Sequence, residues 1–148
     1  MYDLIIIGAG PAGIAAGIYA ARQKLSILIV SKDIGGQVAK KAVDIENYPG
    51  FEKISGPDLV ELYKKQIATN ELEVLTNEEV VSVEKPLGHS QTGEAGKNFV
   101  VKTKSGKTFE SIVVINTSGA ESKLINVPGE EEFAGKGVSY CSLCDGPI

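Results

Sequence analysis

Two short apolar runs separated by a stretch of small residues open the chain. Residues 4–7 and 27–30 carry only aliphatic side chains, which is typical of strands buried on both faces. The residues between them, 12–21, are mostly small and suit a helix packed closely against a sheet. A strand, a crossover helix and a second strand within about 30 residues predict a right-handed βαβ unit with parallel strands.

The pattern changes further along the chain. Residues 31–55 show no clear periodicity, which predicts a long functional loop. A helix is expected to begin at Pro57 and to run to about residue 70, and a third strand is expected at 73–75. Three runs rich in β-branched residues predict an antiparallel meander: 80–83, 99–103 and 108–115. The predicted fold class is α/β: a Rossmann-like domain with a parallel sheet, crossover helices and this three-stranded meander.

Composition and charge exclude several classes of protein. The chain has 148 residues, of which 43% are hydrophobic and two are Cys, so neither a disordered chain nor a disulfide scaffold is expected. A net charge of −4 argues against binding to nucleic acid. The uncharged stretch 4–21 is interrupted by Gly and Pro, and the start lacks a positive segment. We therefore expect no membrane span and no signal peptide, and we predict a cytoplasmic location.

A glycine-rich motif lies between the first strand and the first helix. Its residues are Gly8, Ala9, Gly10, Pro11, Ala12 and Gly13. They fit the pattern G-x-G-x-x-G, in which the first glycine allows a tight turn, the second lets a pyrophosphate approach the backbone, and the third permits close packing of helix and strand. Free N–H groups and the helix dipole then attract phosphate. The motif predicts dinucleotide binding; a purely structural turn is the alternative.

The acidic residue that usually follows the second strand of such a site and binds the ribose is missing. Val30 is followed by Ser31, whose hydroxyl can still hydrogen-bond a ribose, and Asp33 lies two residues further on. NAD recognition depends on that carboxylate, whereas a larger cofactor has other anchors. The departure therefore favours FAD over NAD at this site.

Cys141 and Cys144 form a C-x-x-C motif. Zinc requires four ligands, and the only histidine, His89, raises the count from this chain to three at most, so we predict no metal site and take His89 as a solvated loop residue. A structural disulfide would close a very short loop in a cytosolic protein. A redox-active dithiol is favoured. Asp145 could move protons during thiol–disulfide exchange, or could simply charge a helix N-terminus.

Five motifs together resemble those of a known family. They are GAGPAG at 8–13, GGQ at 35–37, DIENYPG at 44–50, VPGE at 127–130 and CSLCDG at 141–146. In this order and spacing they resemble the low-molecular-weight thioredoxin reductases and the related flavoprotein half of alkyl hydroperoxide reductase. The resemblance covers the whole chain.

The resemblance implies FAD as the cofactor, with its pyrophosphate on the glycine-rich loop. Further cofactor contacts that it implies are Gly36, Gln37, Asn47, the backbone of Val80, Ser118 and Gly119. For Asn47, support of a turn is an alternative role. Cys144 would face the flavin, Cys141 would attack the disulfide of the partner, and Asp145 would be the acid–base residue.

The resemblance also implies an order of domains and of electron transfer. Residues 1–116 would be the N-terminal part of an FAD-binding domain, and 117–148 a connection into an NADPH domain that carries the dithiol. In the parent enzyme, a homodimer by resemblance, electrons would pass from NADPH through FAD to Cys141–Cys144 and on to a thioredoxin-like protein.

The chain ends before a second glycine-rich motif, so we expect a fragment, a split subunit or a truncated product. Two alternatives stay open: the flavoprotein half of an alkyl hydroperoxide reductase, and a non-catalytic FAD-binding module.

Overall fold

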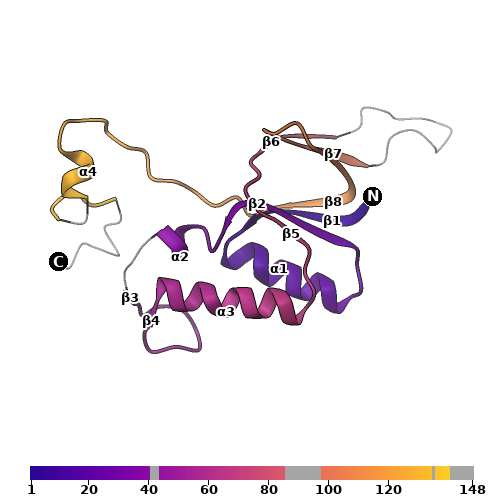
Figure 1. Ribbon diagram of the computed structural model, residues 1–148, viewed down its shortest axis with the longest axis horizontal. Helices are drawn as coiled ribbons and strands as arrows, with labels where there is room; N and C mark the ends of the chain where they lie inside the picture. The colour runs from indigo at the N-terminus through magenta and orange to yellow at the C-terminus, as the bar shows by residue number, and fades with distance from the viewer. Residues whose placement is uncertain (41–43, 86–97, 135, 141–148) are drawn as a thin grey trace.

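A six-stranded sheet organises the chain (Figure 1). The computed structural model describes residues 1–40, 44–85, 98–134 and 136–140. The strands of the large sheet are β1 (Tyr2–Ala9), β2 (Ile27–Ile34), β5 (Val74–Leu75), β6 (Val80–Glu84), β7 (Phe99–Thr103) and β8 (Thr108–Asn116). Their order is β5-β2-β1-β8-β7-β6. The first four strands run parallel to one another, and β8, β7 and β6 form antiparallel pairs.

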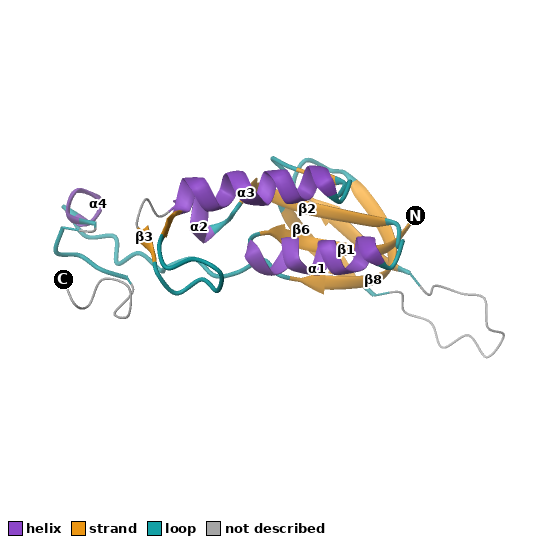
Figure 2. Ribbon diagram, turned by 90° about the horizontal axis from the view of Figure 1, so that it is seen from below, coloured by secondary structure: helices purple, strands orange, loops and turns teal. Residues whose placement is uncertain are grey.

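Two long helices lie on one face of this sheet (Figure 2). They are α1 (Pro11–Arg22) and α3 (Gly56–Thr69). Helix α3 begins as the sequence predicted: Pro57 is in its first turn, and the Ser55 hydroxyl caps it by accepting a hydrogen bond from the N–H of Asp58. Leu59 and Tyr63 of α3 are buried and pack against Ile14 of α1.

The meander is present, and its last strand has a second role. Strands β6, β7 and β8 pair in sequence order, as predicted. Strand β8 also pairs in parallel with β1, with Ile5 opposite Val114. The carboxyl end of β8 therefore lies beside that of β1, at the place where the glycine-rich loop leaves the sheet.

The prediction of a loop over 31–55 was wrong in part. Strand β2 continues to Ile34, and the segment then forms the short elements α2 (Gln37–Lys40), β3 (Asp44–Ile45) and β4 (Ile54–Ser55). Ile45 and Ile54 pack against the apolar side of α3. Elements of two to four residues leave no periodic signal, because their stability comes from tertiary packing.

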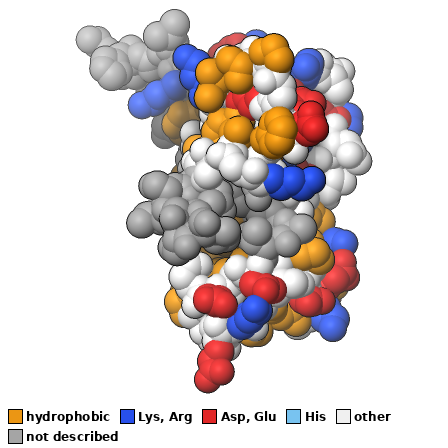
Figure 3. All heavy atoms as spheres, turned by 90° about the vertical axis from the view of Figure 1, so that its left-hand side faces the viewer, with side chains coloured by type: hydrophobic (Ala, Val, Ile, Leu, Met, Phe, Trp, Pro, Cys, Tyr) orange, Lys and Arg blue, Asp and Glu red, His pale blue; other side chains and the backbone are white. Residues whose placement is uncertain are grey.

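After β8 the chain runs away from the sheet to a one-turn helix, α4 (Glu130–Phe133). Figure 3 shows hydrophobic side chains gathered at this end of the molecule; the exposed ones in the segment are Leu124, Ile125, Val127 and Phe133. The Glu130 carboxylate shapes the segment by accepting hydrogen bonds from the N–H groups of Ile125, Asn126 and Val127.

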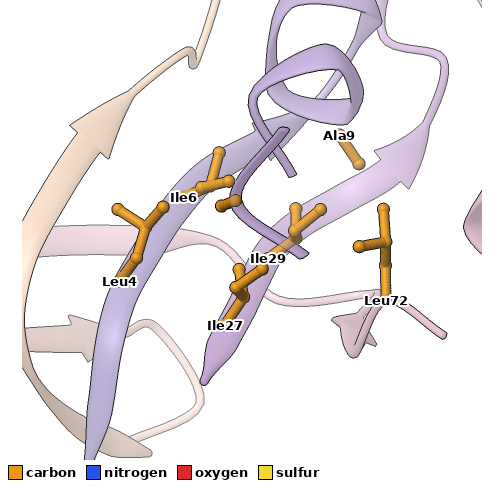
Figure 4. Packing of buried hydrophobic residues seen from close by; sticks show 7 residues of the cluster. Leu4, Ile6, Ala9, Ile27, Ile29 and Leu72 are labelled. Atoms are coloured by element: carbon orange, nitrogen blue, oxygen red, sulfur yellow. The ribbon is translucent and has the colours of Figure 1, made fainter. Parts of the chain in front are cut away.

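The core explains why residues 4–7 and 27–30 are apolar without interruption. Leu4 and Ile6 of β1 and Ile27 and Ile29 of β2 point to the helical face and pack with Leu72 (Figure 4). The alternate residues of the two strands point the other way and pack with Val101 of the meander: Ile5, Leu28 and Val30. Both faces are covered, so the prediction of strands buried on two sides is confirmed.

Candidate functional site

A pocket opens at the carboxyl ends of β1, β2 and β8. Its volume is about 400 Å³, which is in the range of small-molecule sites. The lining comes from residues 7–12, 30–33, 36, 37, 40, 78–80 and 117–121. Within the sheet, β2 lies next to one edge of β1 and β8 lies next to its other edge. This is a topological switch point, where open α/β sheets bind their ligands.

The glycine-rich loop forms one wall of the pocket, and two of its glycines are required by the fold. Gly8 has a φ of +101°, and a Cβ there would lie 2.5 Å from the Thr117 carbonyl oxygen. A Cβ on Gly13 would lie 1.9 Å from the carbonyl oxygen of Gly8. The tight turn and the close helix–strand contact that the sequence predicted are therefore present.

Gly10 differs from these two glycines because it leaves space on the side of the pocket. Its φ is −79°, and the nearest described atom to a Cβ placed there is the Gly35 carbonyl oxygen, at 4.0 Å. The residue is the N-cap of α1 and has no side chain to cap the helix, whose first intrahelical bond runs from Ile14 N–H to Gly10 C=O. The N–H groups of the first turn and the positive end of the helix dipole therefore meet the pocket.

Thr117 holds this loop in place. Its hydroxyl donates to the carbonyl oxygens of Ile7 and Gly8 at 2.8 and 3.0 Å, and its N–H donates to the Ile7 carbonyl at 2.9 Å. The residue follows β8, so these bonds fix the end of β8 against the start of the glycine-rich loop. The sequence singled out Ser118 and Gly119 in this segment and missed Thr117, because its partners lie 109 and 110 residues away.

Helix α2 reaches across the other end of the pocket to the segment after β8. The Gln37 side-chain amide donates to the Ala120 carbonyl oxygen at 2.8 Å, and the Lys40 ammonium pairs with the Glu121 carboxylate at 2.5 Å. This ion pair raises the pKa of Lys40 and lowers that of Glu121. Both bonds connect α2 to residues 120 and 121, so they define that end of the pocket.

The carboxylates that line the pocket are all engaged by protein partners. Asp33 accepts a hydrogen bond from the Gly36 N–H at 3.1 Å, and Glu79 lies 2.9 Å from the Lys32 ammonium. The buried Glu78 lies 2.6 Å from the Lys107 ammonium and accepts from the Ser105 hydroxyl at 2.7 Å. The negative charges of Glu78 and Glu79 are thus offset by lysines before any anionic ligand binds.

Glu78 makes the folded state sensitive to acid. The Lys107 ammonium, followed by the Ser105 and Thr103 hydroxyls, lowers the pKa of Glu78 from 4.5 to about 2. A carboxyl group whose pKa is lower in the folded state stabilises that state above its unfolded pKa, and this contribution is lost as the pH falls toward the folded value. We expect the stabilisation by Glu78 to be complete above about pH 5 and to disappear between about pH 5 and pH 2.

This expectation is checked by measuring the free energy of unfolding of the wild type and Glu78→Gln in denaturant, from pH 6 to pH 2. The variant should be less stable at pH 6, and the difference should vanish toward pH 2. Glu84→Gln is the control, since it removes one charge from an exposed ion pair between Glu84 on β6 and Lys102 on β7. A difference between wild type and Glu78→Gln that does not change with pH would contradict the prediction.

The structure brings most of the predicted cofactor residues together around this one pocket. Those that line it are Gly8, Ala9, Gly10, Pro11, Ala12, Ser31, Gly36, Gln37, Val80, Ser118 and Gly119. Gly13 lies behind the loop, and Asn47 is an exposed residue between β3 and β4 that is outside the described lining. For all of these predicted cofactor residues, contact with a ligand stays a prediction.

Sequence reasoning missed the charged residues of the pocket: Lys32, Lys40, Glu78, Glu79 and Glu121. They come from four separate segments, so no local motif contains them. Cys141, Cys144, Asp145 and His89 lie outside the described residues. In the part of the chain that is described, no cluster of three or more His, Cys, Asp or Glu side chains could hold a metal ion. No helix among the same residues is long and apolar enough to cross a membrane.

A parallel sheet with a glycine-rich loop at its switch point defines an α/β domain of the dinucleotide-binding class. The particular family follows from comparison with known sequences. The pattern of the pyridine nucleotide-disulphide oxidoreductase family matches residues 2–147, and the chain belongs to this family.

Relatives and solved structures agree with this assignment. Over 147 residues, or 99% of the chain, it is 42% identical to a thioredoxin reductase of Bacillus subtilis and 39% identical to one of Listeria monocytogenes. The crystal structure of thioredoxin reductase from Streptococcus pyogenes covers 99% of the chain, with a TM-score of 0.80 and 39% identity. The chain spans 43% and 42% of the two relatives and 44% of the structure.

These findings confirm two predictions made from the sequence: the resemblance to thioredoxin reductases and the α/β fold of an FAD-binding domain. The division of the chain at residues 116 and 117 stays a prediction, although β8 does end at Asn116.

Proposed function

We propose that the chain is the FAD-binding part of a flavoenzyme of thioredoxin reductase type. In the whole enzyme, electrons pass from NADPH through FAD to the Cys141–Cys144 disulfide, and from there to the disulfide of a thioredoxin-like protein. The observation that carries this proposal is the glycine-rich loop. It leads into α1, and the N-terminus of α1 faces a pocket at the switch point of the sheet. The thioredoxin partner, a homodimer and a cytoplasmic location belong to the same proposal.

The residues around the pocket suit the charge and shape of such a cofactor. A pyrophosphate carries negative charge, and the first turn of α1 offers it N–H groups and the positive end of a helix dipole. Gly10 leaves room for close approach, since a Cβ there would meet no described protein atom nearer than 4.0 Å. Val80 and Ser31, which lies beside Ala9 of the loop, also line the pocket, and an adenosine group would extend toward them from the phosphates.

The chemistry that a bound flavin supplies is two-electron transfer between a nicotinamide and a disulfide. The described residues contribute positioning. Gln37 and Lys40 connect α2 to Ala120 and Glu121, and Thr117 connects the end of β8 to the glycine-rich loop. These bonds place the segment that leads toward Cys141 and Cys144 next to the pocket where the cofactor is proposed to bind.

Binding of FAD and of ADP to the purified chain tests this proposal. ADP contains the adenosine and pyrophosphate groups that the described pocket would contact, so it probes the site independently of the flavin ring. At a concentration 100 times the Kd, either ligand should add about 2.7 kcal/mol to the free energy of unfolding and raise the melting temperature by roughly 8 °C. An absorption spectrum after desalting shows whether flavin is retained. A melting temperature that neither FAD nor ADP changes would contradict the proposal.

A further inference from the structure

The residue that follows Val30 on β2, where a ribose-binding acid is usual, already has other partners. The hydroxyl of Ser31 donates its proton to the Asp33 carbonyl oxygen at 2.7 Å and accepts the N–H of Ala9 at 3.0 Å. The residue is only 9% exposed. A hydroxyl engaged in this way anchors the glycine-rich loop to β2. With its proton donated and one lone pair occupied, it keeps a single acceptor position, whereas a carboxylate has lone pairs for two ribose hydroxyls.

Asp33 also has a structural role. Its Oδ1 atom accepts the N–H of Gly36 at 3.1 Å, which holds the turn between β2 and α2. Both polar residues that the sequence offered for the ribose thus stabilise the loops around the pocket.

A carboxylate from another segment lies next to the same position. The N–H of Asn77 donates to the Lys32 carbonyl oxygen, and the N–H of Glu78 donates to that of Ser31, both at 3.1 Å. Residues 77–79 therefore run alongside the end of β2. This places Glu79 beside Ser31 and Lys32, and Glu79 also lines the pocket.

Two lysines hold the Glu79 carboxylate without using all of its lone pairs. Its Oε1 atom lies 2.9 Å from the Lys32 ammonium, and its Oε2 atom lies 3.6 Å from that of Lys104. The side chain is 39% exposed, and a carboxylate has about four acceptor positions. Positions thus remain for hydroxyl donors. The lysines, Lys32 first, also lower the pKa of Glu79, so the group is ionised at neutral pH.

We propose that Glu79 is the ribose-binding residue of this site, and that its carboxylate accepts hydrogen bonds from the hydroxyls of the adenosine ribose. The carboxylate that is missing from the end of β2 is supplied instead by the segment before β6. This inference rests on the proposed FAD function and identifies the nucleoside end of the same pocket. Lys32 is a positioning residue, because it holds Glu79 beside the end of β2.

The test compares the binding of ADP with that of 2′-deoxy-ADP and 3′-deoxy-ADP by isothermal titration calorimetry. The wild-type chain should bind ADP about tenfold more tightly than at least one deoxy analogue, since the analogue lacks a hydroxyl that donates to a charged acceptor. In Glu79→Ala this ratio should fall to about one. The ratio is the decisive quantity, because removing Glu79 also frees Lys32, which alone can change the affinity for every phosphate ligand.

Glu84→Ala is the matched control. Glu84 is also paired with a lysine, Lys102 at 2.6 Å, and lies on β6 outside the lining of the pocket, so the tenfold ratio should persist in this variant. A ratio that stays at about tenfold in Glu79→Ala, or a wild-type ratio of about one, would overturn the assignment of Glu79 while leaving FAD binding intact. A wild-type chain that binds neither ADP nor FAD would overturn the proposed function as well.

Discussion

Replacement of Gly13 by alanine is expected to lower the free energy of unfolding by about 3 kcal/mol or more. Gly13 lies in the first turn of α1, and a Cβ there would be 1.9 Å from the Gly8 carbonyl oxygen and 2.8 Å from the Thr117 hydroxyl oxygen. The first of these atoms belongs to the backbone of the glycine-rich loop and cannot move away as a flexible side chain can. The helix would have to shift from β1, which disturbs the contact that joins them.

The sign of this effect separates packing from helix propensity. Alanine is the better helix former by about 1 kcal/mol, so a Gly13 that merely occupied a helical position would give a more stable variant when replaced. Urea denaturation of Gly13→Ala and wild type, followed by circular dichroism, decides between the two. A variant as stable as the wild type, or more stable, would show that α1 lies further from β1 than the structure places it.

The sequence predicted the βαβ unit and the glycine-rich loop because both depend on local constraints. Branched aliphatic residues over 4–7 and 27–30 are required by burial on both faces of the sheet. Gly8 is required by a positive φ, and Gly13 by a contact only five residues away in sequence. Each of these signals is contained in a short stretch of chain.

The rest of the pocket depends on partners that are far apart in sequence. Thr117 bonds to the carbonyl groups of Ile7 and Gly8 because β8 pairs in parallel with β1, and the apolar pattern of a meander does not indicate which strand its edge joins. Glu79, proposed to bind the ribose, lies beside the end of β2 because Asn77 and Glu78 hydrogen-bond to it. These contacts follow from the topology of the sheet, so no motif in a single sequence reveals them.

Ser31 has a structural role that its position in the sequence does not indicate. The sequence lacks an acidic residue after Val30 and offers the Ser31 hydroxyl in its place. In the structure this hydroxyl joins Ala9 to Asp33. A buried hydroxyl cannot be assigned to a ligand from its position in the sequence alone, because it needs hydrogen-bond partners whether or not a ligand is present.

Replacement of Gly10 by alanine is expected to have the opposite effect to that of Gly13→Ala: a folded chain with a damaged site. Gly10 has a φ of −79°, which alanine adopts without strain, and its Cβ would meet no described atom nearer than the Gly35 carbonyl oxygen at 4.0 Å. As the N-cap of α1 it should lose no more than about 1 kcal/mol of stability on replacement. The new methyl group, however, would project beside the N–H groups of the first turn, where a pyrophosphate must approach.

The expected loss of affinity for FAD and for ADP is about 100-fold, equivalent to about 2.7 kcal/mol, since two hydrogen bonds from N–H groups to a charged phosphate are weakened together. Calorimetric titration of each ligand measures the affinity, and thermal unfolding without ligand confirms that the fold is kept. Because the protein itself leaves space at Gly10, a large loss of affinity in a stable variant can be attributed to the ligand. If Gly10→Ala binds both nucleotides as well as the wild type does, the pyrophosphate does not lie on this loop. The glycines would then serve only the turn and the packing of α1, which is the structural alternative that the motif left open.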